Sequence, residues 1–321
     1  QVLDDTIIVA EHDPYLITAS SPQVASSDSN FAIVYTMFYT KSPRLAIFSP
    51  DGMRLIDGVL VSDSEKGSSP SVAFTGSEYG IQWTEVEGEP GVDESYFLKF
   101  ARFSTNGQKL STDVTIIAAG YPERIMNHLL TFIGDRYAAF RIDDSAESLT
   151  DLYIVFYNDE GARIGDEKLV MQTESIDRYE VAYSDEGFAI TISPNEMDNS
   201  SWFRISRTAE PLSELEPLTF CKSADIVYAQ NNYGIACFFD GEIYFRLMST
   251  DGEQIGDAVR LSQGTSPAET SMFPVIIFTG SEFGVSWNAY NDYNDTLNFQ
   301  RVLQNGALLG DAAILFNHFF R

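Results

Sequence analysis

Oxygen-bearing side chains gather near the C-terminal end of the sequence, where they alternate with tyrosines. This stretch contains Asn288, Tyr290, Asn291, Asp292, Tyr293 and Asp295. Aromatic rings stack on sugar rings, while amides and carboxylates bind hydroxyl groups, so the mixture suits a glycan or another polar ligand. We expect these six residues to contact a ligand. The alternative is an exposed turn in which the two tyrosines pack locally.

A second oxygen-rich stretch contains Asp143, Asp144 and Glu147. Calcium takes roughly six to eight oxygen ligands, which clusters of this kind could supply. No spaced Asp-x-Asp-x-Asp-Gly loop accompanies them, however. Two interpretations stay open. In the first, which the composition favours, the three residues lie in solvated turns of an acidic protein. In the second they bind calcium, which is the one cofactor that the sequence suggests.

Other familiar chemistries lack their residues. His12, His128 and His318 have no metal-ligand spacing, and His128, just before a predicted strand, is expected to be structural. The sequence contains no glycine-rich phosphate loop, Gly-x-Ser-x-Gly turn or His-Glu-x-x-His helix. The two cysteines are too few for a cysteine-based zinc cluster. We expect Cys237 to be a buried thiol, with a disulfide to Cys221 as the less favoured alternative.

Charge excludes further classes of partner. The chain has 47 Asp and Glu against 20 Lys and Arg, a formal net charge of -27. Such a charge repels nucleic acid and anionic membranes. No run of apolar residues approaches the roughly 20 needed to cross a bilayer, so we expect no membrane insertion.

The elements that must position these residues are strands, because a pattern of apolar residues recurs six times. Each unit has an aromatic marker residue: Phe31, Tyr79, Tyr137, Phe188, Tyr233 and Phe283. Seven positions before each marker stands an apolar residue: Val24, Val72, Leu130, Val181, Ile226 and Ile276. Apolar residues alternate around both positions, and short polar links separate them, which predicts a β-hairpin in each unit.

A second hairpin follows in each unit. Asp-Gly, Asn-Gly or Glu-Gly pairs mark its turn, and the fourth unit has Arg207 to Glu216 instead. Such pairs favour tight turns because these need a positive φ. Each unit therefore has four strands, and the markers recur every 45 (233 minus 188) to 58 (137 minus 79) residues. Four-stranded repeats of about this length are typical of propeller blades, so we predict an all-β, six-bladed β-propeller.

We expect residues 1–321 to form one domain. The predicted blades are residues 22–69, 70–124, 125–177, 178–224, 225–270 and 271–321. Residues 1–21 are expected to close the ring through one further antiparallel strand at Asp5 to Glu11. A seven-bladed ring is the alternative.

Trp83, Arg141 and Trp287 each stand four positions after a marker. Trp83 and Trp287 occupy this place in their units, so we expect them to pack between blades. Arg141 is the charged member of the same column, and we expect an ion pair with Asp143 or Asp144 rather than an anion site.

The repeat resembles the secreted bacterial six-bladed propellers of the TolB-like superfamily, in motifs such as Gly241-Glu-Ile-Tyr-Phe-Arg-Leu and Ser249-Thr-Asp-Gly. The resemblance implies an extracytoplasmic protein: secreted, periplasmic or at the cell surface. We predict a noncatalytic binding module that holds a protein or glycan on its loop-rich face, where strand two joins strand three. The alternative is a calcium-dependent hydrolase of the lactonase or glycosidase kind.

Overall fold

The alternating apolar and polar residues fold into antiparallel sheets in the computed structural model. The structure describes residues 19–27, 29–37, 40–88, 93–120, 125–146, 149–194, 198–219, 221–262, 270–291 and 294–319. These residues form six four-stranded sheets, each ordered as in the sequence. The predicted class, a six-bladed β-propeller with four antiparallel strands per blade, is confirmed. None of the described residues forms a helix that could span a membrane.

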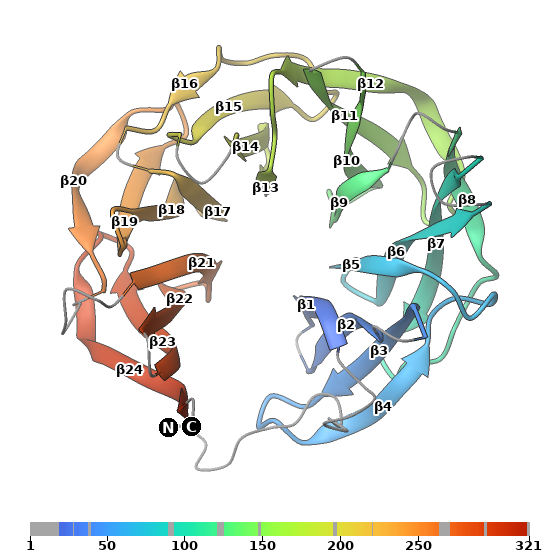
Figure 1. The fold of residues 1–321 in the computed structure, drawn as a ribbon, viewed down its shortest axis with the longest axis horizontal. Coiled ribbons are helices and arrows are strands. Elements are labelled where there is room, and N and C mark those ends of the chain that lie inside the picture. The colour runs from blue at the N-terminus through green and yellow to red at the C-terminus, as the bar shows by residue number, and fades with distance from the viewer. Residues whose placement is uncertain are drawn as a thin grey trace. The chain divides into compact units, whose positions relative to one another are not determined.

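The chain divides into two compact units of three sheets each, residues 1–173 and 174–321 (Figure 1). Unit 1 contains β1 (Ala19–Ser26), β2 (Phe31–Met37), β3 (Ser42–Phe48), β4 (Arg54–Leu60), β5 (Ser68–Phe74), β6 (Glu78–Glu87), β7 (Ser95–Ser104), β8 (Val114–Gly120), β9 (Met126–Phe132), β10 (Tyr137–Ala146), β11 (Leu149–Tyr157) and β12 (Arg163–Thr173). Unit 2 contains β13 (Arg178–Ser184), β14 (Gly187–Ser193), β15 (Ser201–Ser206), β16 (Glu216–Pro217), β17 (Ser223–Ala229), β18 (Asn232–Phe239), β19 (Glu242–Ser249), β20 (Gln254–Arg260), β21 (Thr270–Phe278), β22 (Glu282–Asn291), β23 (Asn294–Leu303) and β24 (Leu308–Phe319).

The expected closing strand lies mostly outside the described residues. Asp5 to Glu11 belong to the undescribed part, and residues 19–21 are the start of β1. The sixth sheet takes all four of its described strands, β21 to β24, from the C-terminal part of the chain.

Within each unit, the marker aromatics of the second and third sheets join their own sheet to the preceding one. Within its sheet, Tyr137 packs against Phe132 with ring centroids 5.1 Å apart. Toward the preceding sheet it meets Phe100 of β7 at 5.0 Å. Phe283 does the same in unit 2, against Phe278 at 5.1 Å and Phe245 of β19 at 5.0 Å. Edge-on aromatic pairs of this kind favour one relative position of the two sheets.

A small residue directly after the marker makes this packing possible. A Cβ on Gly80 would lie 2.4 Å from Cε1 of Tyr137 in the next sheet. A Cβ on Gly234 would lie 2.5 Å from Cε1 of Phe283. The other units have alanine or glycine at this position. The aromatic ring therefore rests on the backbone of the preceding sheet.

Gly80→Ala tests this contact. Because the added methyl group overlaps the ring of Tyr137, the free energy of unfolding should fall by about 1–3 kcal/mol. In a Tyr137→Leu background the same substitution should cost less, since the ring is gone. Urea unfolding of the four proteins gives the coupling; additive costs would contradict the contact.

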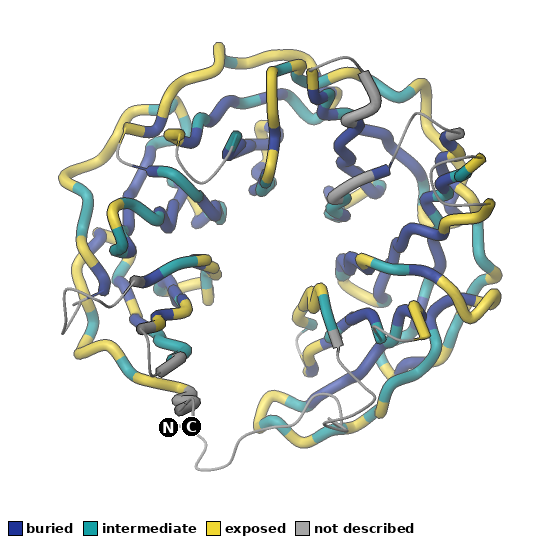
Figure 2. Tube along the Cα trace, viewed as in Figure 1, coloured by how far each residue is buried: buried dark blue, intermediate teal, exposed yellow. Residues whose placement is uncertain are grey.

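The hydrophobic clusters combine buried side chains of neighbouring sheets. Along the backbone, the middle strands of the sheets are mostly buried and the outermost strands mostly exposed (Figure 2). Trp83 is fully buried between the first and second sheets of unit 1. Trp287 is 3% exposed between the last two sheets of unit 2. Their predicted packing between blades is confirmed. In the first sheet of unit 1, which has no preceding sheet in that unit, Val24 and Phe31 are 56% and 40% exposed.

The second hairpin turn is tight in the fourth unit as well, although its sequence lacks glycine there. Ala209 donates its N–H to Ser206 O at 2.9 Å and adopts a φ of 64°. Gly107 does the same with Ser104, with a φ of 78°. The fourth unit therefore lacks the glycine of the other second hairpins but forms the same kind of turn.

The expectation for the cysteines is wrong in one respect. Both are fully buried between the sheets β13–β16 and β17–β20, but they form a disulfide. Pairing of β17 with β18 sets Ala224 opposite Cys237, which brings Cys221, three residues before Ala224, against Cys237. This register is what the sequence spacing could not reveal.

Replacing both cysteines by alanine should lower the free energy of unfolding by roughly 3 kcal/mol, the value expected for a closed loop of about 15 residues. Chemical denaturation of the two proteins measures the loss. A thiol assay on the denatured, unreduced protein is the control, and two titratable thiols would contradict the disulfide.

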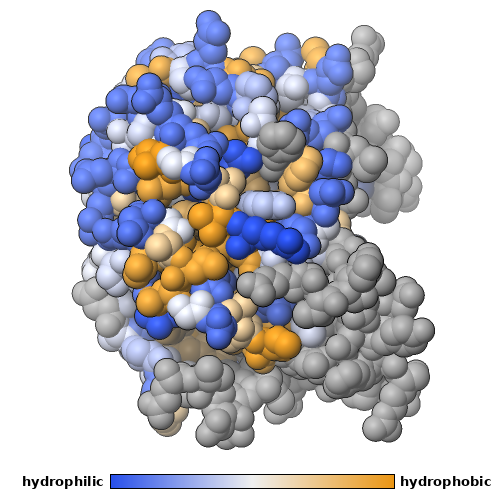
Figure 3. All heavy atoms as spheres, turned by 90° about the vertical axis from the view of Figure 1, so that its left-hand side faces the viewer, coloured by the Kyte–Doolittle hydropathy of each residue, from blue (hydrophilic) through white to orange (hydrophobic). Residues whose placement is uncertain are grey.

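The outer side of unit 2 mixes polar and apolar groups (Figure 3). Ile255 on β20 and Ile314 and Leu315 on β24 are between 41% and 60% exposed. Scattered apolar residues are normal on a protein surface, so this side alone indicates no partner.

Candidate functional site

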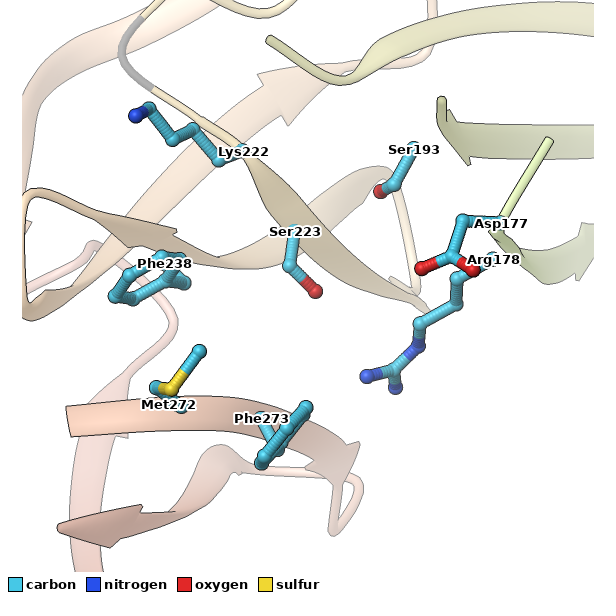
Figure 4. A pocket seen from close by; sticks show the side chains of 8 residues that line it. All are labelled: Asp177, Arg178, Ser193, Lys222, Ser223, Phe238, Met272 and Phe273. Atoms are coloured by element: carbon cyan, nitrogen blue, oxygen red, sulfur yellow. The ribbon is translucent and has the colours of Figure 1, made fainter. Parts of the chain in front are cut away.

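A pocket opens in unit 2 at the end of the sheets where first strands begin and second strands end (Figure 4). Its volume is about 60 Å³. It is lined by Asp177, Arg178, Ser193, Lys222, Ser223, Phe238, Met272 and Phe273. This is the end of the sheets that the sequence analysis assigned to ligand-binding loops.

Three of the lining residues hold the same place in the repeat. Arg178, Ser223 and Phe273 each lie ten positions before the marker of their unit, on the first strands β13, β17 and β21. The β13–β14 and β17–β18 registers bring Arg178 and Ser223 to one level, each opposite the residue five positions after its marker. In β21 a register shift sets Met272 at that level, opposite Asn288, with Phe273 next to it. A cation, a hydroxyl and an aromatic ring on neighbouring first strands thus make a chemically mixed site.

A β-bulge directs Phe273 into the pocket. The register of β21 against β22 shifts between Met272 and Val275, and Phe273 has a φ of 54°. A positive φ is unfavourable for a bulky residue and is found where the surroundings or function demand it. Ser21 and Ser69 stand at the same place in the first two sheets, with φ of 52° and 51°. The bulge thus recurs, but in the sixth sheet it presents an aromatic ring that is 52% exposed.

Charged groups behind the pocket hold Arg178. Its Nε donates to Oε1 of Glu180 on the same strand at 2.9 Å. Asp225 on β17 attracts it as well. A guanidinium between two carboxylates keeps its charge and loses little freedom on binding.

Asp225 is fixed by the backbone. Its Oδ1 accepts from the N–H of Ile226 at 2.8 Å, and its Oδ2 accepts from the N–H of Ile276 in the next sheet at 2.9 Å. Ser71 does the same in unit 1, where its Oγ accepts from Leu130 N at 3.0 Å. A first strand has no partner strand on one side, so these side chains satisfy N–H groups that would otherwise be buried unpaired. Both oxygens of Asp225 are thus engaged away from the pocket.

The pKa of Asp225 is raised from 3.8 to about 7, first by burial and then by the negative charge of Glu180, while Arg178 and the two backbone N–H groups oppose the rise. Burial likewise raises the pKa of Glu180, with Arg178 again opposing it. The folded protein therefore keeps a proton in this cluster at pH values where the unfolded chain has released it.

Asp225→Asn should remove a pH-dependent part of the stability. Because the pKa of Asp225 is raised from 3.8 to about 7, its contribution to the free energy of unfolding falls as pH rises from 4 to 7, by at most about 1.4 kcal/mol per pH unit. Wild-type stability minus variant stability should fall over the same range. Denaturant unfolding at several pH values measures it.

Asp251→Asn at an exposed turn is the matched control, because it removes the same charge outside the cluster. An Asp225→Asn difference that stays constant between pH 4 and pH 7 would contradict proton retention by Asp225.

Two of the six residues predicted to contact ligand, Asn288 and Tyr290, pair with or contact Met272 of this pocket. Asn288 is exposed on β22 and paired with Met272, a lining residue. Tyr290 is 41% exposed, and its hydroxyl contacts Met272 Sδ at 2.7 Å. Asn291 and Asp295 are strand residues rather than loop residues, because the β22–β23 pairing extends to Asn291 and Asn294. Asp292 and Tyr293 lie outside the described residues. Ligand contact by these residues stays a prediction.

The three predicted calcium ligands are described only in part, so a calcium site at these residues stays a prediction. Asp143 is buried, with its Oδ2 3.3 Å from Arg141 Nη1. Asp144 lies on β10, so it is part of a strand and not of the expected loop, and Glu147 lies outside the described residues. No group of three or more His, Cys, Asp or Glu side chains suited to a metal occurs among the residues described.

The ion pair predicted for Arg141 is confirmed, and the structure adds a second partner. Arg141 Nε and Nη2 donate to the two oxygens of Glu167 on β12 at 2.7 and 3.0 Å. Glu167 lies 26 residues away in sequence, so only the pairing of β11 with β12 brings it near.

His128 has a hydrogen-bond partner at one ring nitrogen. Gln82 accepts from the Tyr157 hydroxyl at 3.2 Å, and its amide nitrogen lies 3.1 Å from His128 Nδ1. Nδ1 therefore accepts a hydrogen bond. Burial lowers the pKa of His128 to about 4, so the ring is neutral at physiological pH.

A place for Arg178, Lys222 and Phe273 in the lining of a pocket was not predicted from the sequence. One signal was available: Phe273 precedes a proline, as do Ser21 and Ser69 at the same place in their units. Alignment of the six units on that position would have set Phe273 apart.

No family model and no curated protein sequence matches this chain. Solved propeller structures do. A subtype N10 neuraminidase-like protein of A/little yellow-shouldered bat/Guatemala superposes with a TM-score of 0.57 at 10% identity, over 87% of this chain and 92% of that one. Prolyl oligopeptidase B from Galerina marginata superposes with a TM-score of 0.55 at 13% identity, over 94% of this chain and 42% of that one. Trypanosoma rangeli sialidase superposes with a TM-score of 0.52 at 9% identity, over 86% of this chain and 53% of that one.

At these identities the likeness shows the fold alone. The chain also spans less than half the length of the prolyl peptidases that it matches. These proteins differ in activity, so the shared fold does not decide between binding and catalysis.

Proposed function

We propose that this chain is a noncatalytic binding module, which holds a protein or glycan by a group inserted into the pocket of unit 2. The pocket carries the proposal. Its volume of about 60 Å³ is far below the roughly 300–1,000 Å³ of sites that enclose a whole small molecule. A pocket of this size suits one protruding group of a larger ligand, with the exposed Phe273, Asn288 and Tyr290 beside it to contact the remainder.

The repeat supports a single site rather than several equal ones. Arg178, Ser223 and Phe273 differ although each lies ten positions before the marker of its unit. A lectin with one pocket per blade would repeat the same residues at that level. The mixed lining instead favours one ligand held in one orientation.

An extracytoplasmic location fits this role. The buried disulfide is consistent with an oxidising compartment, where such bonds form and persist. The resemblance of the repeats to secreted TolB-like propellers and the strongly acidic composition favour the same location.

No observation among the described residues favours the calcium-dependent hydrolase. Asp143 is neutralised by Arg141, and both oxygens of Asp225 accept from backbone amides. We therefore propose binding alone.

Phe273→Ser tests the site. Serine is the residue at this position in the first two sheets, with the same backbone conformation, so the fold should tolerate it. Fluorescently labelled wild-type protein applied to a glycan array and a displayed peptide library should give a set of hits. The variant should lose about fivefold to thirtyfold in affinity for them, since stacking on an exposed aromatic is worth about 1–2 kcal/mol.

Leu169→Ser is the matched control, because Leu169 on β12 is also 52% exposed and lies in unit 1. It should bind as wild type does. Hits that survive Phe273→Ser unchanged would contradict the proposal, as would equal losses in both variants.

A further inference from the structure

The charge of the pocket lining is reversed relative to the chain. Acidic residues outnumber basic ones 47 to 20 overall, yet the lining contains two cations, Arg178 and Lys222, and one carboxylate, Asp177. At physiological salt, charges farther away than about 8 Å are largely screened. Glu180 and Asp225 lie behind Arg178 and hold it in place, so the positive charge is confined to the groups that face the pocket.

The guanidinium of Arg178 is built to receive a planar anion. Its Nε is committed to Glu180, which leaves the terminal nitrogens Nη1 and Nη2 as donors. No described residue accepts a hydrogen bond from them. Figure 4 shows the group extending from β13 toward Phe273 of β21, with 29% of the side chain exposed. Two parallel N–H donors match the two oxygens of a carboxylate.

A hydroxyl faces the same space. The Ser223 side chain, on β17, points toward Asp177 and Arg178 (Figure 4), and its Oγ has no hydrogen-bond partner among the described residues. Lys222 Nζ lies at the rim, 5.9 Å from the centre of the Phe239 ring. A bound oxygen near Arg178 would thus find a further donor in Ser223 and a nearby positive charge in Lys222.

Size and the apolar wall limit what can enter. A volume of about 60 Å³ corresponds to about two water molecules, at roughly 30 Å³ each, which a single carboxylate can replace. Phe238, Met272 and Phe273 form the opposite wall and offer no hydrogen bond to a second polar group. They suit the apolar carbon atoms that carry the carboxylate.

We propose that the pocket is a subsite for a carboxylate group on the protein or glycan ligand proposed above, received by the terminal nitrogens of Arg178 and the hydroxyl of Ser223. Glu180 acts as a positioning residue, because it fixes the guanidinium through Nε and leaves the two receiving nitrogens free. Asp177 weakens the site, since its carboxylate repels the incoming group. Selectivity for an acidic group follows from this arrangement, whereas a ligand with a cation or an amide at the same place gains less.

Three probes that share a 4-fluorobenzyl group compare an acidic, a neutral and a cationic group at the same place. They are 4-fluorophenylacetate, the neutral 4-fluorophenylacetamide and the cation 4-fluorobenzylamine. Their binding to the full chain is measured by fluorine NMR at neutral pH in 0.15 M salt. The acetate should bind at least tenfold more tightly than either of the others. An amide or amine that binds as tightly as the acetate would overturn the carboxylate subsite.

Variants assign the interaction to its residues. Arg178→Gln alone leaves buried carboxylates without their cation and risks unfolding, so Arg178→Gln combined with Glu180→Gln removes the pair together. This double variant should lose at least tenfold in affinity for 4-fluorophenylacetate, and Ser223→Ala should lose about threefold to tenfold. Asp177→Asn should bind about threefold more tightly. Unchanged affinity in both folded loss variants overturns the assignment.

The two proposals fail separately. If Phe273→Ser abolishes binding to array hits but no probe distinguishes acetate from acetamide, the binding module stands and the carboxylate subsite falls. If the acetate binds through Arg178 but Phe273→Ser leaves all array hits unchanged, the subsite stands and the role of the pocket in holding the larger ligand falls.

Discussion

The contact between each marker aromatic and the sheet before it is the constraint on which both units depend. Tyr137 and Phe283 each rest on a glycine of the preceding sheet and meet an aromatic ring on its third strand. A larger residue in place of Gly80 or Gly234 would push the sheets apart. The hydrophobic clusters that lie between neighbouring sheets can form only at the separation that this contact sets.

The pocket is a consequence of the same regularity. Because neighbouring sheets repeat one packing, residues near one repeat position arrive at the same end of neighbouring first strands. Arg178, Ser223 and Phe273 meet in this way, although 45 and 50 residues separate them in turn (223 minus 178 and 273 minus 223). The fold supplies the convergence, and substitutions at one position are enough to give it chemistry.

The repeat, its four strands and the packing of Trp83 and Trp287 could be predicted from the sequence, because alternation and turn residues are local signals. The disulfide could not be predicted, since it depends on the β17–β18 register that sets Cys221 against Cys237.

The connection predicted between the second and third strands at Asn288 to Asp295 was too long, because polar residues continue the β22–β23 hairpin as readily as apolar ones do. Asp143 was a predicted calcium ligand because it lies in an acidic stretch, but its carboxylate forms an ion pair with Arg141. Arg178 escaped notice because one arginine carries no local signal; its partners Glu180 and Asp225 are brought together by two strands.

The contact between a marker and the sheet before it also has a direction along the chain. Tyr79, Tyr137, Tyr233 and Phe283 each pack with the sheet that precedes them in sequence. During synthesis, which runs from the N-terminus at about 5–20 residues per second, the receiving sheet has left the ribosome before the aromatic that completes it. Within each unit a new hairpin thus finds a formed surface to join, and the chain need not wait for distant residues before its apolar faces are covered.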